Sequence, residues 1–206
     1  MENPCRYYTL LDHARLEFHT NARPVRLCIK VARSPEEVDA WIKAQRPIVL
    51  GLDIEWKPMF SKTCKENKAS LLQLSCNDDV LLIQLFQVPV PQRLRDVLAD
   101  ERIKKVGVGI MGDALKMQRD WGVVINGIVN LGQGRSLAKV AYAATDIKLS
   151  KKKKICLSNW ENKILSNAQI IYAALDAWVA SESFTVMTTQ GWVQATESTE
   201  HTPVVI

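Results

Sequence analysis

Apolar and polar residues follow two spacings along this chain, one typical of strands and one typical of helices. Every second residue is apolar over residues 24–31, which predicts a strand. The segment Ser34–Glu37 has a serine followed by proline and, three positions on, glutamate, a capping pattern that predicts a helix to about Ala44. Residues 48–56 open with a continuous apolar run, as in a strand buried on both faces.

The remaining elements are predicted from apolar runs and from the turn and capping residues between them. Two apolar strands, 70–75 and 80–86, flank Asn77-Asp78, whose turn chemistry predicts a hairpin. The other predicted elements are a helix 91–100, a strand 104–109, a helix 113–121 ending at Gly122, a strand 123–129, a helix 136–144 and a long helix 167–190 ending at Gly191.

This order of elements predicts an α/β fold. Three consecutive strands, then alternating helices and strands, favour a mixed sheet that is antiparallel first and parallel afterwards, with helices on its faces. The long last helix is apolar nearly all the way round, so we expect it to be buried. The predicted organisation is an N-terminal arm, 1–23, a domain, 24–191, and a C-terminal tail, 192–206. The arm has no clear period, and pairing with a sheet edge is left open for it.

Composition narrows the class of protein without naming a function. With 206 residues, 47% apolar and 24% charged, the chain fits one globular domain. We find no signal peptide and no apolar run of membrane-spanning length, so we expect an intracellular protein of the nucleus or cytoplasm with no membrane partner. The five cysteines lack C-x-x-C spacing, which favours neither a disulfide framework nor a zinc site. A net charge of +5 weakly favours a polyanionic partner.

Two carboxylates end the apolar strand 48–56. Asp53 and Glu55 are two positions apart, so they share a face of the strand, about 6.5–7 Å apart along the chain. Such acids repel each other unless a cation lies between them, and Mg²⁺ is a hard cation that prefers carboxylate oxygens. The alternative is that both acids cap an exposed strand end and pair with lysines.

Two more acids and a tyrosine join this hypothesis. Asp113 stands at the start of a helix, where the alternative role is capping, because the helix dipole stabilises an acid there. Asp176 lies in the most apolar helix, one turn after Tyr172, and shares its face. A buried aspartate needs a partner, and residues 164–206 contain no lysine or arginine, which favours a metal ion. Four such acids suit a site for two metal ions and in-line attack on a phosphodiester.

Four segments then resemble a known family: Asp53-Ile-Glu55-Trp56, Lys105–Asp113, Ser158-Asn159-Trp160 and Gln169–Ala177. In this order they are similar to the exonuclease motifs of the DEDDy group of the DnaQ-like superfamily, above all to Werner-syndrome-type exonuclease domains and their RNase D relatives. The resemblance covers about residues 25–190 and marks the predicted domain 24–191 as an exonuclease domain. It implies a ribonuclease-H-like fold and a 3′-to-5′ exonuclease that uses two Mg²⁺ or Mn²⁺ ions and releases nucleoside monophosphates.

The resemblance also implies a role for each site residue. Asp53 would bridge both ions, Glu55 and Asp176 would complete the first site, and Asp113 would hold the second ion through water. Tyr172 would orient the attacking water. Relatives of this kind form dimers or rings, so the resemblance leaves self-association open, and it leaves DNA and RNA open as substrates.

Two observations keep other functions in view. Residues 130–135 run almost directly into the next helix, where the family has a longer stretch, so a non-catalytic nucleic-acid-binding or scaffold protein with the exonuclease fold is the alternative. The segment Gly107–Gly112 matches the dinucleotide fingerprint GxGxxG, but no acid follows at the position that would hold a ribose. We therefore expect these glycines to form a tight turn that brings Asp113 to the sheet.

Candidate substrate contacts come from a tryptophan and four lysines. Trp56 would stack on the terminal base or pack in the core. Lys62 and Lys65, after the catalytic strand, would contact the backbone of the substrate. Lys152 and Lys153 belong to a run of four lysines, which is a solvated loop, a phosphate-binding lip or a nuclear localisation signal.

Overall fold

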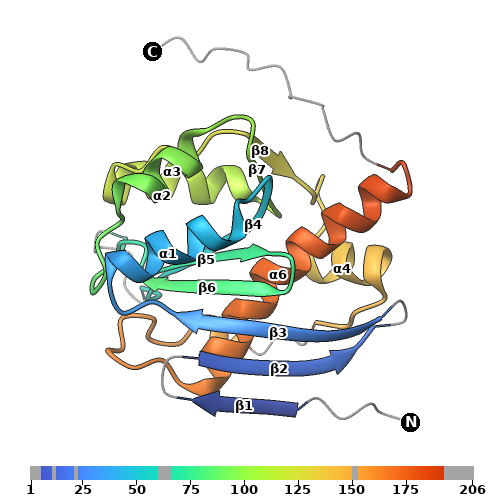
Figure 1. Cartoon of the computed structure of the whole chain (residues 1–206), viewed down its shortest axis with the longest axis horizontal. Helices are drawn as coiled ribbons and strands as arrows, with labels where there is room; N and C mark the ends of the chain where they lie inside the picture. The colour runs from blue at the N-terminus through green and yellow to red at the C-terminus, as the bar shows by residue number, and fades with distance from the viewer. Residues whose placement is uncertain (1–5, 11–12, 21–22, 60–65, 150–152, 193–206) are drawn as a thin grey trace.

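The computed structural model describes residues 6–10, 13–20, 23–59, 66–149 and 153–192, and Figure 1 shows the whole chain. Eight strands form one sheet in the order β1-β2-β3-β6-β5-β4-β7-β8. The strands are β1 (Arg6–Leu10), β2 (His13–His19), β3 (Pro24–Val31), β4 (Val49–Glu55), β5 (Leu71–Cys76), β6 (Asp79–Gln84), β7 (Lys104–Gly107) and β8 (Ile128–Asn130). The helices are α1 (Pro35–Gln45), α2 (Gln92–Ala99), α3 (Ile110–Trp121), α4 (Leu137–Thr145), α5 (Lys153–Cys156) and α6 (Asn167–Thr189).

The pairing of the strands confirms the predicted mixed sheet. Strands β4, β5 and β6 are antiparallel neighbours, and Asn77 in the turn between β5 and β6 has a positive φ of 54°, as the hairpin prediction requires. Strands β7 and β8 then continue the sheet parallel to β4. At the other edge β3 pairs parallel with β6, and β1 and β2 extend the sheet as an antiparallel hairpin. The described part of the predicted N-terminal arm therefore supplies two edge strands.

Helices cover both faces of the sheet (Figure 1), and alternate residues of the central strands pack against one layer or the other. Leu72 and Leu74 of β5 pack in the apolar cluster that contains residues of α1, α2 and α3. Leu71 of β5 and Leu82 of β6 pack in the second cluster, with residues of α6. Strand β5 is buried along its whole length because both of its faces are covered.

Helix α6 is the core helix of the second layer. It begins with a complete capping box between Ser166 and Gln169 and ends just before Gly191, which has a φ of 70°. By length and composition alone α6 could cross a membrane, but half of its most apolar stretch is buried against the rest of the protein. The sequence prediction of a long, buried helix is confirmed.

Three local predictions differ from the structure. Helix α3 begins at Ile110 rather than at Asp113, because Gly109 caps it in a left-handed conformation with a φ of 75°. The predicted strand 123–129 is extended chain whose alternating residues Val123 and Ile125 pack into the core without a strand partner, and pairing starts only at Ile128. The polar segment after α4 contains the short helix α5, for which the sequence has no capping signal.

Candidate active site

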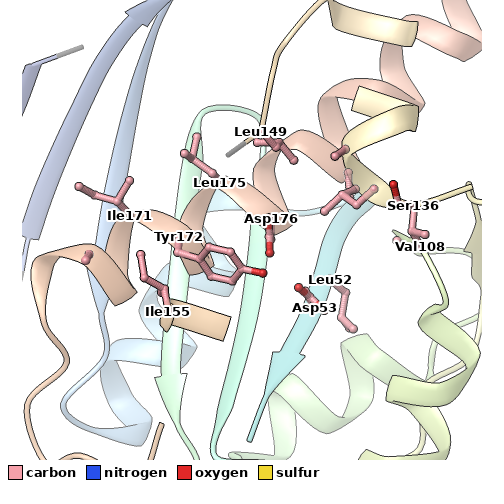
Figure 2. A pocket seen from close by; sticks show the side chains of 15 residues that line it. Leu52, Asp53, Val108, Ser136, Leu149, Ile155, Ile171, Tyr172, Leu175 and Asp176 are labelled. Carbon is pink, nitrogen blue, oxygen red and sulfur yellow. The ribbon is translucent and has the colours of Figure 1, made fainter. Parts of the chain in front are cut away.

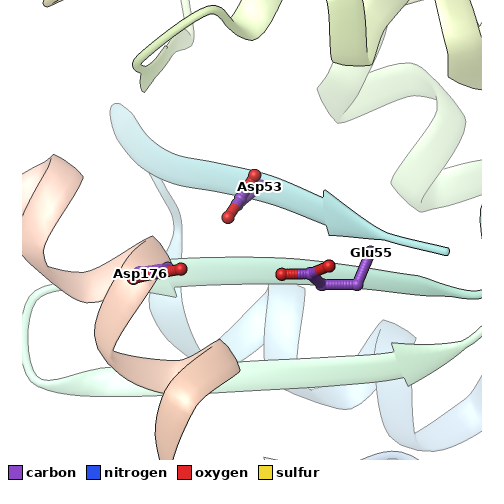
Figure 3. Close-up of side chains that lie close together, drawn as sticks. All are labelled: Asp53, Glu55 and Asp176. Atoms are coloured by element: carbon purple, nitrogen blue, oxygen red, sulfur yellow. The ribbon is translucent and has the colours of Figure 1, made fainter. Parts of the chain in front are cut away.

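The end of strand β4 and the middle of helix α6 bring three carboxylates together. Asp53 and Glu55 lie on the face of β4 that α6 covers, and Asp176 reaches them from α6 (Figure 3). One carboxylate oxygen from each residue lies within 4.8 Å of those of the other two. Asp176 follows Asp53 and Glu55 by more than 120 residues, so only the fold creates this cluster.

A close approach of α6 to the sheet fixes Asp176 in this position. A Cβ atom on Gly51 would collide with the carbonyl oxygen of Ala177 and with the hydroxyl of Ser75. The same Ser75 hydroxyl donates a hydrogen bond of 2.8 Å to the Ala177 carbonyl and lies 2.8 Å from the hydroxyl of Ser181. Because the backbone of α6 is held next to Asp176, its carboxylate cannot move far from β4.

Asp113, the fourth predicted acid, lies in the first turn of α3 and is not one of the three carboxylates within 4.8 Å of one another. Burial is the main cause that raises the pKa of Asp53 and of Glu55, but the charge of Asp113 adds to both, so Asp113 lies within electrostatic reach of them. Burial raises its own pKa to about 7. The turn before α3 places it there: Gly107 packs against the carbonyl oxygen of Leu52, and Gly109 supplies the left-handed residue.

The carboxylates of the site are largely buried from water and repel each other. Burial is the largest cause that raises the pKa of Asp53 well above its usual value, and the charges of Asp176 and Asp113 follow. Burial, then Asp53, raises the pKa of Glu55 to about 10. Within the described part of the chain, no lysine or arginine forms an ion pair with Asp53 or Glu55. A group of hard oxygen donors with this excess of negative charge fits a divalent cation.

Tyr172 lies one turn before Asp176 on α6 and points toward the acids (Figure 2). Its hydroxyl is hydrogen-bonded to Asp176, and it accepts a hydrogen bond of 3.0 Å from the thiol of Cys156 on α5. Burial is the largest cause that raises the pKa of Tyr172, so the hydroxyl stays protonated. Sequence reasoning missed Cys156, because a lone cysteine in a polar segment belongs to no motif.

A largely apolar cavity of about 480 Å³ opens beside the acids (Figure 2). Asp53, Tyr172 and Asp176 line one part of it, and the hydroxyl of Ser136 lines another. The apolar part includes Leu52, Val108, Leu137, Leu149, Ile155 and Ile171. The cavity is of the size that small-molecule sites have, and its two acids and Tyr172 lie together.

The segment between β8 and α4 lies next to this site and contains a tight turn. The side-chain oxygen of Asn130 accepts hydrogen bonds from the backbone N–H of Gly109 at 3.0 Å and of Gly132 at 3.2 Å. Gln133 and Gly134 follow with positive φ values of 41° and 85°. Asn130 therefore joins this turn to the turn that precedes α3 and Asp113.

The predicted substrate contacts lie in different places. Trp56 is half-buried against the cluster of α1, α2 and α3, with Lys116 Nζ 4.7 Å from its ring centroid. Lys153 is exposed on α5. Lys62, Lys65 and Lys152 lie outside the described residues.

The sequence of this chain matches a family model described as 3′-5′ exonuclease over residues 29–192. It is 32% identical over 149 residues to a 3′-5′ exonuclease of Arabidopsis thaliana, covering 67% of this chain and 52% of that protein. It is 33% identical over 154 residues to the exonuclease 3′-5′ domain-containing protein 2 of Homo sapiens, covering 66% of this chain and 24% of that protein. The chain thus spans about half the length of the plant relative.

Solved structures show the same fold at lower identity. The EXO domain of Nibbler from Aedes aegypti superposes with a TM-score of 0.68 at 21% identity, covering 79% of this chain and 88% of that one. RNase D from Escherichia coli gives a TM-score of 0.66 at 18% identity, covering 81% of this chain and 47% of that one.

Proposed function

We propose that this chain, which belongs to the 3′-5′ exonuclease family, hydrolyses phosphodiester bonds at the 3′ end of a nucleic acid and releases nucleoside monophosphates. The observation that carries the proposal is the group of three carboxylates within 4.8 Å at the end of β4. A tyrosine hydroxyl and a cavity lie directly beside this group.

Divalent cations, Mg²⁺ or Mn²⁺, are the cofactors that this proposal requires. Asp53, Glu55 and Asp176 would hold them, and Asp113 would supply a further ligand. When bound, two such ions lower the pKa of a water molecule and stabilise the charge on the leaving oxygen. The crowding of buried acids supports this role, because a cation offsets both the burial and the mutual repulsion that raise their pKa values.

Tyr172 supplies a hydrogen-bonding group rather than a charge. Its hydroxyl is fixed from two sides by Asp176 and Cys156, and it stays protonated because its pKa is raised. We assign it the role of orienting the attacking water. A hydroxyl fixed in one position accelerates the attack more than a freely rotating hydroxyl would.

The cavity supports an end-directed reaction. Its apolar walls would take the terminal nucleoside, while its polar end leads to the acids where the scissile phosphate would lie. The walls come from β4, α4, α5, α6 and residues 107–108, and in our proposal they enclose one terminal group rather than the middle of a chain. Nucleic acid is therefore the partner that we propose, with a free 3′ end as the element that is recognised.

Digestion of labelled oligonucleotides tests the proposal. Matched single-stranded DNA and RNA, labelled at the 5′ or the 3′ end, are incubated with Mn²⁺, with Mg²⁺ or with EDTA. We expect a ladder of shortened 5′-labelled products with metal and none with EDTA. Asp176→Asn should reduce nucleotide release about 100-fold or more, since it removes a group that supports the transition-state charge.

Asp96→Asn is the matched control, because Asp96 lies on α2, outside the site. Its carboxylate accepts a hydrogen bond from the side chain of Gln92. The variant should cleave like the wild type. Oligonucleotides that stay intact with either metal, yet are retarded in a gel, would instead support a non-catalytic nucleic-acid-binding protein. The tight turn at 130–135 is the observation that favours this alternative, because the family has a longer segment there.

A further inference from the structure

We propose that Gln73 is a positioning residue, whose side-chain amide holds the Asp53 carboxylate in its metal-binding orientation once cations load the site. The inference rests on the proposed function, because it concerns how the same acids receive a cation. It adds a residue that carries no charge and belongs to none of the four motif segments.

The register of the sheet places Gln73 beside Asp53. Strands β4 and β5 are antiparallel, and Asp53 lies directly opposite Gln73. Directly opposed side chains project from the same face, with their Cβ atoms about 4.5–5.5 Å apart. Gln73 therefore lies on the face that carries Asp53 and Glu55 and that α6 covers.

The amide of Gln73 is completely buried and has no partner. Its side chain is 0% exposed, and neither Nε2 nor Oε1 makes a hydrogen bond. Buried amides are almost always hydrogen-bonded, so an amide with both ends unpaired needs an explanation. The next polar residue on the same face is different: the hydroxyl of Ser75 is bonded to Ala177 and lies 2.8 Å from the hydroxyl of Ser181.

The carboxylate of Asp53 needs the kind of group that Gln73 offers. One of its oxygens, Oδ1, accepts a hydrogen bond of 2.9 Å from the backbone N–H of Ile54. Carboxylates that bind metals are usually oriented by hydrogen bonds from outside the metal site, and losing such a bond typically costs 10- to 100-fold in metal affinity or activity. An amide N–H can serve here without adding a charge to a crowded acidic site.

Gln73→Met tests this role, because methionine keeps an unbranched chain of similar length and removes both polar atoms. Gln73→Leu is a second variant, in case one side chain packs poorly. Thermal unfolding is followed in EDTA and across a series of Mn²⁺ concentrations. We expect the metal-free variant to be as stable as the wild type or more so, since it loses two unpaired buried atoms. The Mn²⁺ concentration for half-maximal stabilisation should rise about tenfold or more.

Ser183→Ala is the matched control. Its hydroxyl is also buried without a partner, but it lies two turns beyond Asp176 on α6. It should change the metal-free stability in the same direction and leave the Mn²⁺ midpoint where it is in the wild type.

Two results would overturn the role of Gln73. One is a Mn²⁺ midpoint in both Gln73 variants within twofold of the wild type. The other is a clear loss of stability of both variants in EDTA, which would show that the amide has a structural partner without metal. A wild type that Mn²⁺ does not stabilise and that releases no nucleotide would refute the proposed function itself, which is a separate outcome.

Discussion

Replacing Glu55 by glutamine should stabilise the metal-free protein while it weakens metal binding. Glu55 lies at the end of β4 with Asp53 and Asp176 around it, and burial together with these charges raises its pKa to about 10 from an ordinary 4.5. Glutamine has nearly the same shape and carries no charge at any pH. The variant therefore removes the electrostatic cost of the residue and keeps its packing.

The sign and size of the effect follow from the two pKa values. In the unfolded chain Glu55 loses its proton near pH 4.5, whereas in the folded protein it keeps the proton up to about pH 10. The folded state therefore holds more protons in this interval, and its stability falls as the pH rises through it. Each pH unit costs about 1.4 kcal/mol, so the loss reaches about 3 kcal/mol at pH 7 and less than about 1 kcal/mol at pH 5.

Unfolding in EDTA at pH 5, 7 and 8 measures this difference. At pH 7 we expect Glu55→Gln to raise the free energy of unfolding by up to about 3 kcal/mol, or the melting temperature by up to roughly 10 °C for a chain of this length. At pH 5 the gain should nearly vanish. Saturating Mn²⁺ should reverse the order, because it stabilises the wild type more than the variant.

Asp78→Asn is a control of opposite sign. Burial opposes the ionisation of Asp78, but hydrogen bonds from Arg23 and Trp178 outweigh it and lower its pKa, so the loss of this charge should destabilise the protein at pH 7. If Glu55→Gln were no more stable than the wild type in EDTA at pH 7, or if its gain were the same at pH 5, the account of the site as a cluster of mutually repelling acids would be wrong.

Three further predictions concern the same site. Tyr172→Phe should slow nucleotide release at saturating Mn²⁺ by about 10- to 100-fold and leave the Mn²⁺ midpoint of thermal stabilisation nearly unchanged, since in our proposal the hydroxyl orients water and is not a metal ligand. Equal rates would contradict this role. Gly51→Ala should destabilise the protein by several kcal/mol in urea unfolding and also weaken Mn²⁺ binding. The added methyl group would push the Ala177 carbonyl, and with it Asp176, away from β4. A variant with wild-type stability would show that α6 has room to move. At subsaturating Mn²⁺, the rate of nucleotide release should rise with pH through about 7, because burial raises the pKa of Asp113 to that value and protons compete with the metal. A pH-independent rate between pH 6 and 8 would argue against this competition.

Much of the fold could be predicted from local patterns, because the elements that matter carry their own signals. The capping box at Ser166 and the glycine at 191 mark both ends of α6, and Asn77 marks the hairpin of β5 and β6. The prediction failed where alternation had another cause. Val123 and Ile125 alternate because two side chains enter the core from an extended segment, which gives the same pattern as a strand.

The candidate site could be predicted only for residues whose type is unusual in its setting. Asp53 and Asp176 are acids in apolar elements, so burial itself indicated a partner. Gln73 and Cys156 could not be found in this way. A glutamine in an apolar strand indicates a site only when its burial and its lack of hydrogen-bond partners are known. The contact between Cys156 and Tyr172 depends on how α5 packs beside α6.

The rigidity around the acids decides how they respond to their own repulsion. Strand β5 is buried along its whole length, and α6 lies so close to Gly51 that a methyl group would not fit. The acids therefore cannot separate, and only protonation or a cation can relieve the repulsion between them. A loosely packed site would instead open, and it would lose the fixed spacing that in-line attack on a phosphate requires. The close packing of α6 on β4 is thus what keeps Asp53, Glu55 and Asp176 at a spacing that suits a divalent cation.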